Sequence, residues 1–402
     1  MIQDKSQFLI VGAGITGLAI ARELLKKEVD DIVILEKEAT TGIHASGRNS
    51  GVLHAGIYYS PDTLKAKYCV SGNQLMKEFC KDKGLTLKEN GKVIVTKSYE
   101  ELEVLYNLKQ RADSARAKAY IIDEKELGKI EPYAKTCEKA LYSPDTAVFK
   151  PLEVLKAMEQ DLVASKKVKI LYNTKFLTIE ESNTALVSDL GSNTRAKIRF
   201  SKFINAAGCF ADKIAQSFGL SKEYKILPFK GTYKKLIKEK SHLVRGNIYP
   251  VPDLKNPFLG VHFTNDADNE VEIGPTVFPA LGRENYGLFD GIDKEIFDII
   301  YNSVILLSLN NFFREYAFKE IKKYRKKFVY ETARKLVPQL LYNDIVDSDK
   351  IGIRAQLLNW QRKELVMDFV VEKTSDSVHI LNAVSPAFTS SMAFAKHIVS
   401  LL

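Results

Sequence analysis

The chain has 402 residues, of which 45% are hydrophobic, and its formal net charge at pH 7 is +9. A chain of this length can bury a large core and favours two lobes, and it contains no run of the roughly eighteen apolar residues that a membrane span needs. The four cysteines have no CxxC spacing, so neither a disulfide framework nor a metal site is predicted. Because no signal-peptide hydrophobic region precedes the first strand, we expect a reduced, cytoplasmic protein.

Residues 8–36 predict a dinucleotide-binding βαβ unit, with two short apolar runs typical of buried strands and a helix-forming stretch between them. Gly12, Gly14 and Gly17 follow the first run. The first permits a tight turn, the second lets backbone approach a pyrophosphate, and the third lets helix and strand pack closely. The helix N-terminus then offers free N–H groups to the phosphates. Glu36 ends the second run and can accept hydrogen bonds from ribose hydroxyls.

Hydrophobic periodicity predicts the remaining elements in chain order. Helices are expected at residues 63–83, 100–117, 123–129 and 211–218, in the region 293–335 and at 388–402. Strands are expected at residues 91–96, 168–172, 175–179, 198–206, 228–233, 248–252, 260–263, 271–274, 351–354, 366–371 and 378–381. Two further strand-to-helix turns, at residues 205–208 and 382–389, also contain small residues. A nicotinamide dehydrogenase needs only one such turn, so three turns favour FAD, a longer cofactor held from several sides.

These patterns predict an α/β fold, in which a Rossmann-like FAD-binding domain carries an inserted antiparallel-sheet substrate domain. A polar loop at residues 40–51 contains three glycines, which indicates backbone close to a ligand. The FAD-binding domain is expected to be discontinuous, formed by residues 1–90, 145–225 and 345–402, and the substrate domain by residues 91–144 and 226–344.

Several motifs carry a resemblance to a known family. Residues 45–59 read ASGRNSGVLHAGIYY, and PFKG (228–231), PFLGVH (257–262) and GIRAQ (352–356) follow in order. With these motifs the chain resembles the FAD-dependent D-amino-acid-oxidase superfamily and, more narrowly, the L-2-hydroxyglutarate oxidase (dehydrogenase) family, over almost its full length. Two positions depart from the family pattern. Lys230 stands where the family often has arginine, and residues 357–363 lack the glycine turn that usually follows the arginine motif.

The resemblance implies oxidation of L-2-hydroxyglutarate, or a close 2-hydroxy acid, to the 2-oxo acid by hydride transfer to FAD, with electrons passed to a quinone or to oxygen. His54 and His262 are the candidate catalytic residues, because an imidazole can take the proton of the substrate hydroxyl. A structural histidine is the alternative reading of each. Arg354 and Lys230 are candidates for binding carboxylate, and Tyr249 for a lid over the pocket. Pairing with an internal carboxylate is the alternative for Arg354, and simple packing is the alternative for Tyr249.

The candidate cofactor-binding residues lie mainly at the three turns and in the glycine-rich loop. They are Gly12, Gly14, Gly17, Glu36, Lys37, Ser46, Asn49, Ser50, Gly51, Phe176, Ala207, Gly208, Ser385 and Thr389. The C-terminal helix is expected to point its N-terminal N–H groups at the flavin and to stabilise the negative charge of the reduced form.

Two alternative functions stay open at this point. One is a flavoenzyme that oxidises glycerol-3-phosphate or an amino acid of the sarcosine type. The other, motivated by the +9 charge, is an RNA-modifying flavoprotein. The chain has no basic stripe interleaved with aromatic residues near the expected flavin, so no nucleic-acid partner is expected.

Residues 314–335 hold nine basic and three acidic residues, a net charge of +6, interleaved with aromatic side chains. This segment predicts either a solvated helix or peripheral docking on an anionic membrane surface, the inner face of the cytoplasmic membrane. The preceding apolar stretch, residues 296–313, is expected to be a core helix.

Overall fold

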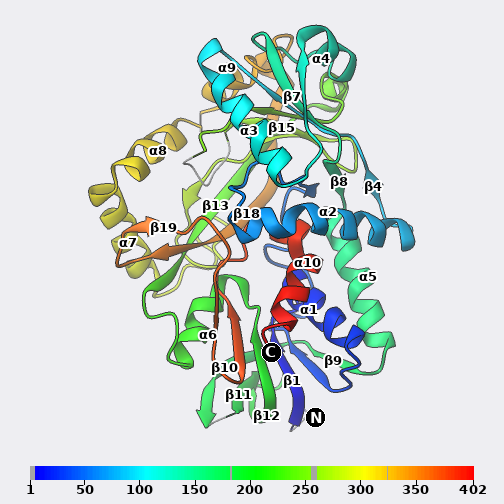
Figure 1. Cartoon of the computed structure of the whole chain (residues 1–402). Coiled ribbons are helices and arrows are strands. Elements are labelled where there is room, and N and C mark those ends of the chain that lie inside the picture. The colour runs from blue at the N-terminus through cyan, green and yellow to red at the C-terminus, as the bar shows by residue number, and fades with distance from the viewer. Residues whose placement is uncertain (1–4, 182, 255–259, 324) are drawn as a thin grey trace. The chain divides into compact units, whose positions relative to one another are not determined.

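The computed structural model of the chain describes residues 5–181, 183–254, 260–323 and 325–402. The chain folds as two compact units, each built from separate stretches of sequence (Figure 1). The first unit comprises Met1–Arg48, Pro151–Pro228 and Arg354–Leu402, and the second comprises Asn49–Lys150 and Phe229–Ile353.

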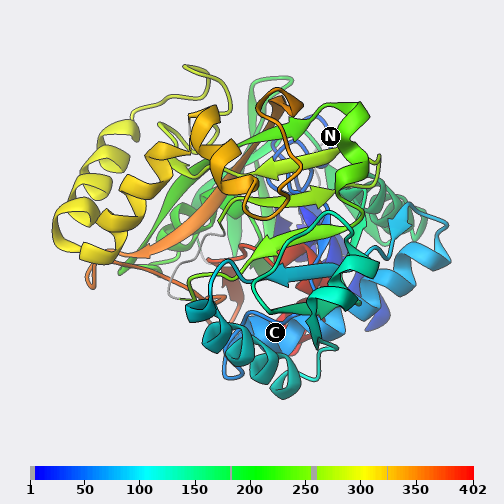
Figure 2. The same ribbon diagram turned by 90° about the horizontal axis from the view of Figure 1, so that it is seen from above.

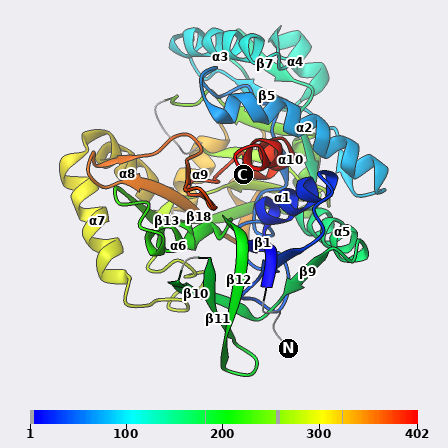
Figure 3. The ribbon, with the colours of Figure 1, turned by 60° about the horizontal axis from the view of Figure 1, so that its bottom comes forward.

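The first unit is organised around a parallel sheet in the order β9-β2-β1-β12-β21, extended by the antiparallel strands β11 and β10 and by β20 (Figure 3). Its central strands are apolar runs whose side chains are buried on both faces, as parallel strands require. The bounds are β1 (Lys5–Val11), β2 (Ile32–Leu35), β9 (Val168–Leu171), β10 (Thr174–Glu181), β11 (Thr184–Asp189), β12 (Thr194–Asn205), β20 (Val371–Lys373) and β21 (Ser377–Ile380). In register, Val11 lies beside both Leu35 and Asn205, so the loops after β1, β2 and β12 leave the sheet at one edge.

The helix that follows β1 packs against the last helix of the chain and against the helix before β9. The helices of this unit are α1 (Ile15–Lys26), α5 (Pro151–Ala164), α6 (Ala211–Ser217) and α10 (Ala387–Val399). Contact between α1 and α10 places the first and last helices of the chain side by side (Figure 3). The helix α5 was not among the predicted elements.

The second unit is built on a mostly antiparallel sheet, in which β14 and β5 form a parallel pair (Figure 2). Its strands are β5 (Lys92–Val95), β6 (Tyr120–Asp123), β7 (Lys139–Ser143), β14 (Asn247–Pro250), β15 (His262–Asn265), β16 (Val271–Gly274) and β17 (Phe278–Pro279). Two longer strands of the sheet, β13 (Tyr224–Leu236) and β18 (Ile345–Asn359), have only residues 229–236 and 345–353 in this unit. A small sheet of β3 (Val52–Leu53), β8 (Ala147–Phe149) and β4 (Leu87–Lys88) lies in the same unit. Its helices are α2 (Leu64–Asp82), α3 (Leu102–Ser114), α4 (Glu124–Ile130), α7 (Ile296–Leu309), α8 (Asn311–Lys322) and α9 (Lys326–Ala333).

Alternation along β5 separates two hydrophobic clusters on the two faces of this sheet. Val93 and Val95 pack in a cluster with residues of α9, whereas Ile94 packs in a second cluster with Leu105 of α3. Because side chains alternate, Lys92 shares the face of Ile94.

The unit boundaries differ from the expected domain boundaries at residues 49–90, which lie in the second unit. Two contacts account for this difference. Val52 of β3 pairs with Val148 of β8, and Ala55 and Ile57 join the cluster around Ile94.

The prediction of a core helix for residues 296–313 is wrong for one face of α7. Ile299 and Leu306 are buried, but Phe297 and Tyr301 are 76% and 63% exposed, and Val304 is exposed as well. The helices α7 and α8, yellow in Figure 2, pack against each other at the edge of the second unit. Within the described residues, no helix is long and apolar enough to cross a membrane.

Candidate functional site

The three glycines after β1 occupy positions where a side chain would meet backbone or a neighbouring hydroxyl. A Cβ on Gly12, whose φ is +105°, would lie 2.5 Å from the carbonyl oxygen of Ala206. A Cβ on Gly17 would lie 2.0 Å from the carbonyl oxygen of Gly12, and one on Gly14 would lie 3.0 Å from Ser46 Oγ. The crowding at Gly12 and Gly17 explains the tight turn and the close helix–strand packing that the sequence predicted.

The backbone N–H groups around the start of α1 are held in place by two side chains. Ile15 N–H donates to Ser46 Oγ at 3.0 Å, and Ala13 N–H donates to Glu36 Oε2 at 3.0 Å. The other oxygen of Glu36 accepts the Glu38 N–H at 3.0 Å. A helix N-terminus with an acidic residue at the end of the second strand fits a dinucleotide, whose phosphates need N–H donors and whose ribose needs an acceptor.

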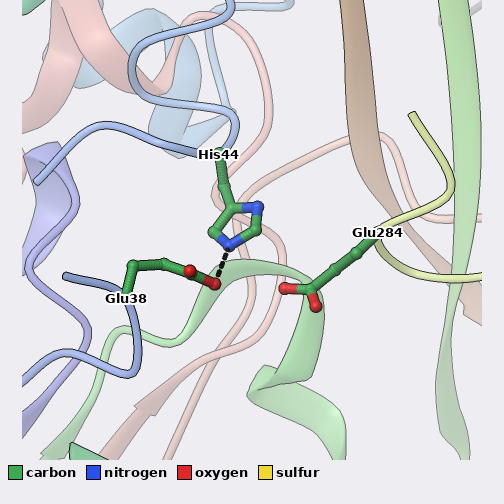
Figure 4. A group of neighbouring side chains, drawn as sticks. All are labelled: Glu38, His44 and Glu284. Carbon is green, nitrogen blue, oxygen red and sulfur yellow. Dashed lines mark hydrogen bonds and ion pairs between the residues drawn. The ribbon is translucent and has the colours of Figure 1, made fainter. Parts of the chain in front are cut away.

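The loop after β2 carries a small charged cluster. Figure 4 shows His44 Nε2 bonded to Glu38 Oε1 at 2.8 Å, and the Lys37 ammonium pairs with the same carboxylate. Burial alone would raise the pKa of Glu38, but the hydrogen bonds and charges of Lys37 and His44 lower it. The Lys37 ammonium, a predicted cofactor contact, is therefore already engaged with Glu38.

The second small-residue turn is fixed by a fully buried amide. Asn205 Nδ2 donates to the carbonyl of Ala211 at 2.7 Å, and Ala207 N–H donates to Asn205 Oδ1. Gly208 has a φ of +55°, a conformation that glycine adopts without strain. This turn places the backbone of Ala207 and Gly208 at the end of β12, next to the start of the loop after β1.

The remaining candidate cofactor residues lie in different settings. Thr389 is buried in the first turn of α10, and Ser385 lies just before that helix. Phe176 is buried against Phe203 in the core of the first unit, so its side chain serves packing. Asn49, Ser50 and Gly51 belong to the second unit, where Asn49 Oδ1 accepts the Gly51 N–H at 2.9 Å.

One face of the sheet in the second unit gathers the two candidate catalytic histidines with two tyrosines and a lysine. Tyr249 of β14 stacks on His262 of β15 with ring centroids 4.1 Å apart, and Lys92 Nζ lies 4.4 Å from the centre of the Tyr58 ring. His54 interacts electrostatically with Lys92 and His262. Tyr249 is 2% exposed, so it lies within this cluster and not over a pocket as a lid.

The backbone of the segment that carries His54 is anchored by α2. Asn73 Nδ2 donates to the carbonyl oxygen of His54 at 3.0 Å, and the Cys69 thiol donates to the same oxygen at 3.6 Å. The carbonyl of Tyr58 accepts from Arg111 Nη1 at 2.8 Å. These contacts explain how a loop that leaves β3 keeps one orientation over the sheet.

Burial makes both histidines neutral. It lowers the pKa of His54 to about 3, with further lowering by the charges of Lys92 and His262. It lowers the pKa of His262 to about 4, against a raising hydrogen bond to Gly260. His262 Nδ1 lies 2.7 Å from the Gly260 carbonyl, so this nitrogen carries the proton and Nε2 is left as an acceptor.

The two candidate carboxylate-binding residues are half-buried. Lys230 Nζ donates to Asn285 Oδ1 at 2.8 Å and to the Gly287 carbonyl at 2.7 Å, so these two acceptors among the described residues use two of its three N–H donors. Burial lowers the pKa of Lys230. Arg354 lies within β18. Residues 257–259, part of a motif that carried the resemblance, are outside the described residues.

The hairpin after Arg354 closes without the expected glycine. It joins β18 to β19 (Glu364–Leu365), and Asn359 Oδ1 accepts the N–H groups of Gln361 and Arg362. Lys363 takes the left-handed conformation, with a φ of +57°. An asparagine side chain and one strained lysine therefore replace the glycine turn.

Lys92, Tyr58 and Asn73 were not predicted from the sequence as functional residues. The signal for Lys92 was a lysine at the start of an apolar strand, Lys92–Val95, in which all four side chains are buried. Period-two alternation places that lysine on one face of the sheet, but the sequence does not say which groups lie opposite.

Comparison with known proteins gives consistent matches. A family model described as FAD dependent oxidoreductase matches residues 7–401. The human mitochondrial L-2-hydroxyglutarate dehydrogenase is 36% identical, over 96% of this chain and 86% of the human one. The L-2-hydroxyglutarate dehydrogenase of Escherichia coli strain K12 is 33% identical, over 98% of this chain and 92% of the bacterial one.

A solved structure supports the same fold. The L-alpha-glycerophosphate oxidase of Mycoplasma pneumoniae with FAD bound has a TM-score of 0.76 at 23% identity, covering 100% of this chain and 95% of that one. Together with the glycine cradle of the first unit, these matches confirm the predicted α/β fold and FAD as the cofactor.

Proposed function

Because the chain belongs to the L-2-hydroxyglutarate dehydrogenase family of FAD-dependent oxidoreductases, we propose that it oxidises L-2-hydroxyglutarate to 2-oxoglutarate. The observation that carries this proposal is identity above 30%, over nearly the whole chain, to dehydrogenases of that acid from human and bacterial sources. The glycerophosphate oxidase is similar in fold at lower identity, so it supports the cofactor and not the substrate.

Bound FAD would supply the hydride acceptor for the carbon that bears the substrate hydroxyl. The neutral imidazole of His54 takes the proton of that hydroxyl, a step for which a histidine must be uncharged beforehand. His262 presents Nε2 as an acceptor, and its ring is held by stacking on Tyr249. Arg354 and Lys230 are the proposed carboxylate-binding side chains, because an arginine offers paired N–H donors and an ammonium offers a point charge.

The test of this function is anaerobic bleaching of the flavin in the purified protein. L-2-hydroxyglutarate is expected to bleach it, whereas the D-enantiomer, glycerol-3-phosphate and sarcosine are not. Bleaching by glycerol-3-phosphate alone would assign the protein to the alternative substrate class. Bleaching by sarcosine alone would assign it to the amino-acid oxidising enzymes.

We also propose that the electron acceptor is a quinone in the membrane, and that the protein reaches it by docking on an anionic bilayer. The helix α7 supports this because Phe297, Ile300, Tyr301 and Val304 are exposed at the i, i+3, i+4, i+7 spacing of one helical face. Such a face can enter the interface between lipid headgroups and acyl chains.

Basic side chains near this face complement an anionic lipid surface. Arg314, Lys322, Arg325 and Lys327 are exposed on α8 and at the start of α9. Each basic residue near an anionic leaflet contributes on the order of 1 kcal/mol. Lys323, which lies in the predicted docking segment, is only 7% exposed and pairs with Glu320, so it is not part of the proposed surface.

Flotation with vesicles tests the docking surface. Wild-type protein is expected to float with anionic vesicles at low salt and not with neutral vesicles or at high salt. The triple change of Phe297, Tyr301 and Val304 to Ser is expected to abolish flotation, and changing Lys322, Arg325 and Lys327 to Gln is expected to weaken it. Tyr99→Ser with Tyr120→Ser, two exposed aromatic residues elsewhere, and Lys125→Gln with Lys129→Gln serve as matched controls.

Two outcomes would contradict docking through α7. One is an absence of flotation under every condition, which favours oxygen or a soluble carrier as the acceptor. The other is equal loss of flotation in the control variants, which would place the binding surface outside α7 and α8.

A further inference from the structure

Lys92 is a buried cation that the proposed reaction has not used. Its side chain is 1% exposed, at the first position of β5. Its Nζ lies 4.4 Å from the ring centre of Tyr58 and 5.1 Å from that of Tyr249, and no hydrogen-bond acceptor within the described residues reaches it. Two aromatic faces attract an ammonium but do not replace its hydration, so burial here works against the charged form.

The groups that face Lys92 come from four segments of the chain, and two of these groups are histidines, which are themselves bases. His54 lies on the segment after β3, and His262 lies on β15. Within the described residues, the groups that interact with Lys92 are Tyr58, Tyr249, His54, His262 and Cys69 of α2. No carboxylate within the described residues pairs with Lys92, and the raising effect of Cys69 on the Lys92 pKa is smaller than the lowering effect of burial, so a second positive charge here is poorly compensated.

Two cations that share one desolvated cluster repel each other strongly. The Lys92 charge lowers the pKa of His54 beyond the lowering that burial causes. Burial in turn lowers the pKa of Lys92 to about 7, so both charge states of its amine are accessible near neutral pH. Protonation of one member of this pair therefore opposes protonation of the other.

We propose that Lys92 is a positioning residue for the oxidation step: it limits the pair it forms with His54 to one positive charge, so the imidazole accepts a proton while the Lys92 amine is neutral. This inference rests on the proposed function. In the step, the substrate O–H bond breaks and an N–H bond forms at His54. The electron pair of the C–H bond leaves as hydride to FAD, and the proton on His54 later returns to water.

Two substitutions of Lys92 distinguish this charge coupling from a purely structural role. Lys92→Arg keeps a permanent charge beside His54 and should oppose proton transfer at every pH, whereas Lys92→Met removes that charge. The less conservative change is therefore expected to be the more active one. If Lys92 only supported packing and cation–π contacts, the arginine variant would be the better substitute.

The first measurement is kcat/KM for anaerobic flavin reduction by L-2-hydroxyglutarate, between about pH 6 and pH 8, because this quantity reports ionisations of the free enzyme. The wild-type value is expected to rise about tenfold, following the neutral fraction of a group with a pKa near 7. The methionine variant is expected to be flat over this range. The arginine variant is expected to stay about tenfold or more below wild type near pH 8.

The second measurement needs no substrate. Histidine-labelled holoenzyme is titrated by NMR, with the His54 signal assigned from its absence in His54→Gln. The midpoint of His54 is expected to move to higher pH in Lys92→Met and to stay low in wild type. Circular dichroism and flavin content confirm that each variant is folded; if the arginine variant does not fold, the methionine variant alone decides.

An unchanged His54 midpoint in Lys92→Met overturns the inference, as does an arginine variant with wild-type kcat/KM. Failure of the proposed function looks different. In that case no 2-hydroxy acid bleaches the wild-type flavin, while the NMR titration still reports on the Lys92–His54 pair.

Discussion

The cofactor cradle and the histidine–lysine cluster are built in opposite ways. The cradle is built mainly from backbone: N–H groups lie at the start of α1, and Gly12 and Gly17 pack so closely on carbonyl oxygens that a Cβ would not fit. The cluster comes from strands far apart in the chain, and its working parts are side-chain charges held away from water. FAD binding by the cradle should therefore be lost when an added side chain collides with backbone, whereas the reaction rate should be lost when a charge in the cluster is changed.

The largest effect is expected from breaking the cradle. In Gly17→Ala the added Cβ would lie 2.0 Å from the Gly12 carbonyl oxygen, so α1 must move away from β1. We expect protein that is insoluble or free of FAD, measured by yield and flavin absorbance. Gly128→Ala, on α4, adds a Cβ that meets nothing within 4 Å and should retain FAD at the wild-type ratio. Full FAD content in Gly17→Ala would contradict this account of the cradle.

The cluster should respond differently, with the cofactor kept and the rate lost. His54→Gln removes the proposed proton acceptor and is expected to slow flavin reduction by about 10²–10⁴-fold while FAD content stays normal. Stopped-flow absorbance under anaerobic conditions measures this rate. His242→Gln, an exposed histidine in the same unit, is the matched control and should reduce at the wild-type rate. Loss of FAD from His54→Gln alone would make this histidine a cofactor-binding residue instead.

A smaller effect is expected at the carboxylate-binding arginine. Arg354→Lys keeps the positive charge but loses the planar pair of donors, so kcat/KM for L-2-hydroxyglutarate should fall about 10–100-fold, mainly through KM. Steady-state or stopped-flow kinetics over a range of substrate concentrations separates KM from kcat. Arg362→Lys, an exposed arginine in the following turn, should leave both constants unchanged. An unchanged KM in Arg354→Lys would show that another group holds the substrate.

The smallest effect is expected on the stability of the fold, and it depends on pH because Lys92 is buried in the histidine–lysine cluster. The pKa of Lys92 falls from its usual 10.5 to about 7 on folding, so the unfolded chain holds this proton more tightly. Below about pH 7, the buried ammonium of Lys92 lowers the free energy of unfolding by its full amount. As the pH rises from about 7 to 10.5, this destabilisation is progressively lost.

Lys92→Met removes that destabilisation. Its melting temperature should exceed that of wild type by a few degrees near pH 6 and by less near pH 9, as measured by thermal unfolding of the holoenzyme. Lys125→Met, an exposed lysine, should show no such pH-dependent difference. A variant less stable than wild type at both pH values would mean that the cation–π contacts outweigh desolvation.

The sequence by itself determined the parts of this protein that depend on neighbouring residues. The glycine spacing after β1 and the acid at Glu36 form a local unit, because a strand, a turn and a helix of fixed geometry leave few other arrangements. Helix starts were equally local. Thr63 caps α2 and Asp123 forms a capping box on α4, since these side chains reach only the N–H groups of the next turn.

Tertiary structure decided what depends on residues distant in sequence. The pairing of β5 with β14 brings Lys92 beside Tyr249, 157 residues away along the chain, and such contacts between distant segments make a strand lysine a buried group. Exposure of Phe297 and Tyr301 on α7 was likewise undetermined, because an apolar helix reads the same whether both faces are covered or one. Local patterns fix backbone geometry, but the charge and hydration of a side chain are set by whichever elements pack around it.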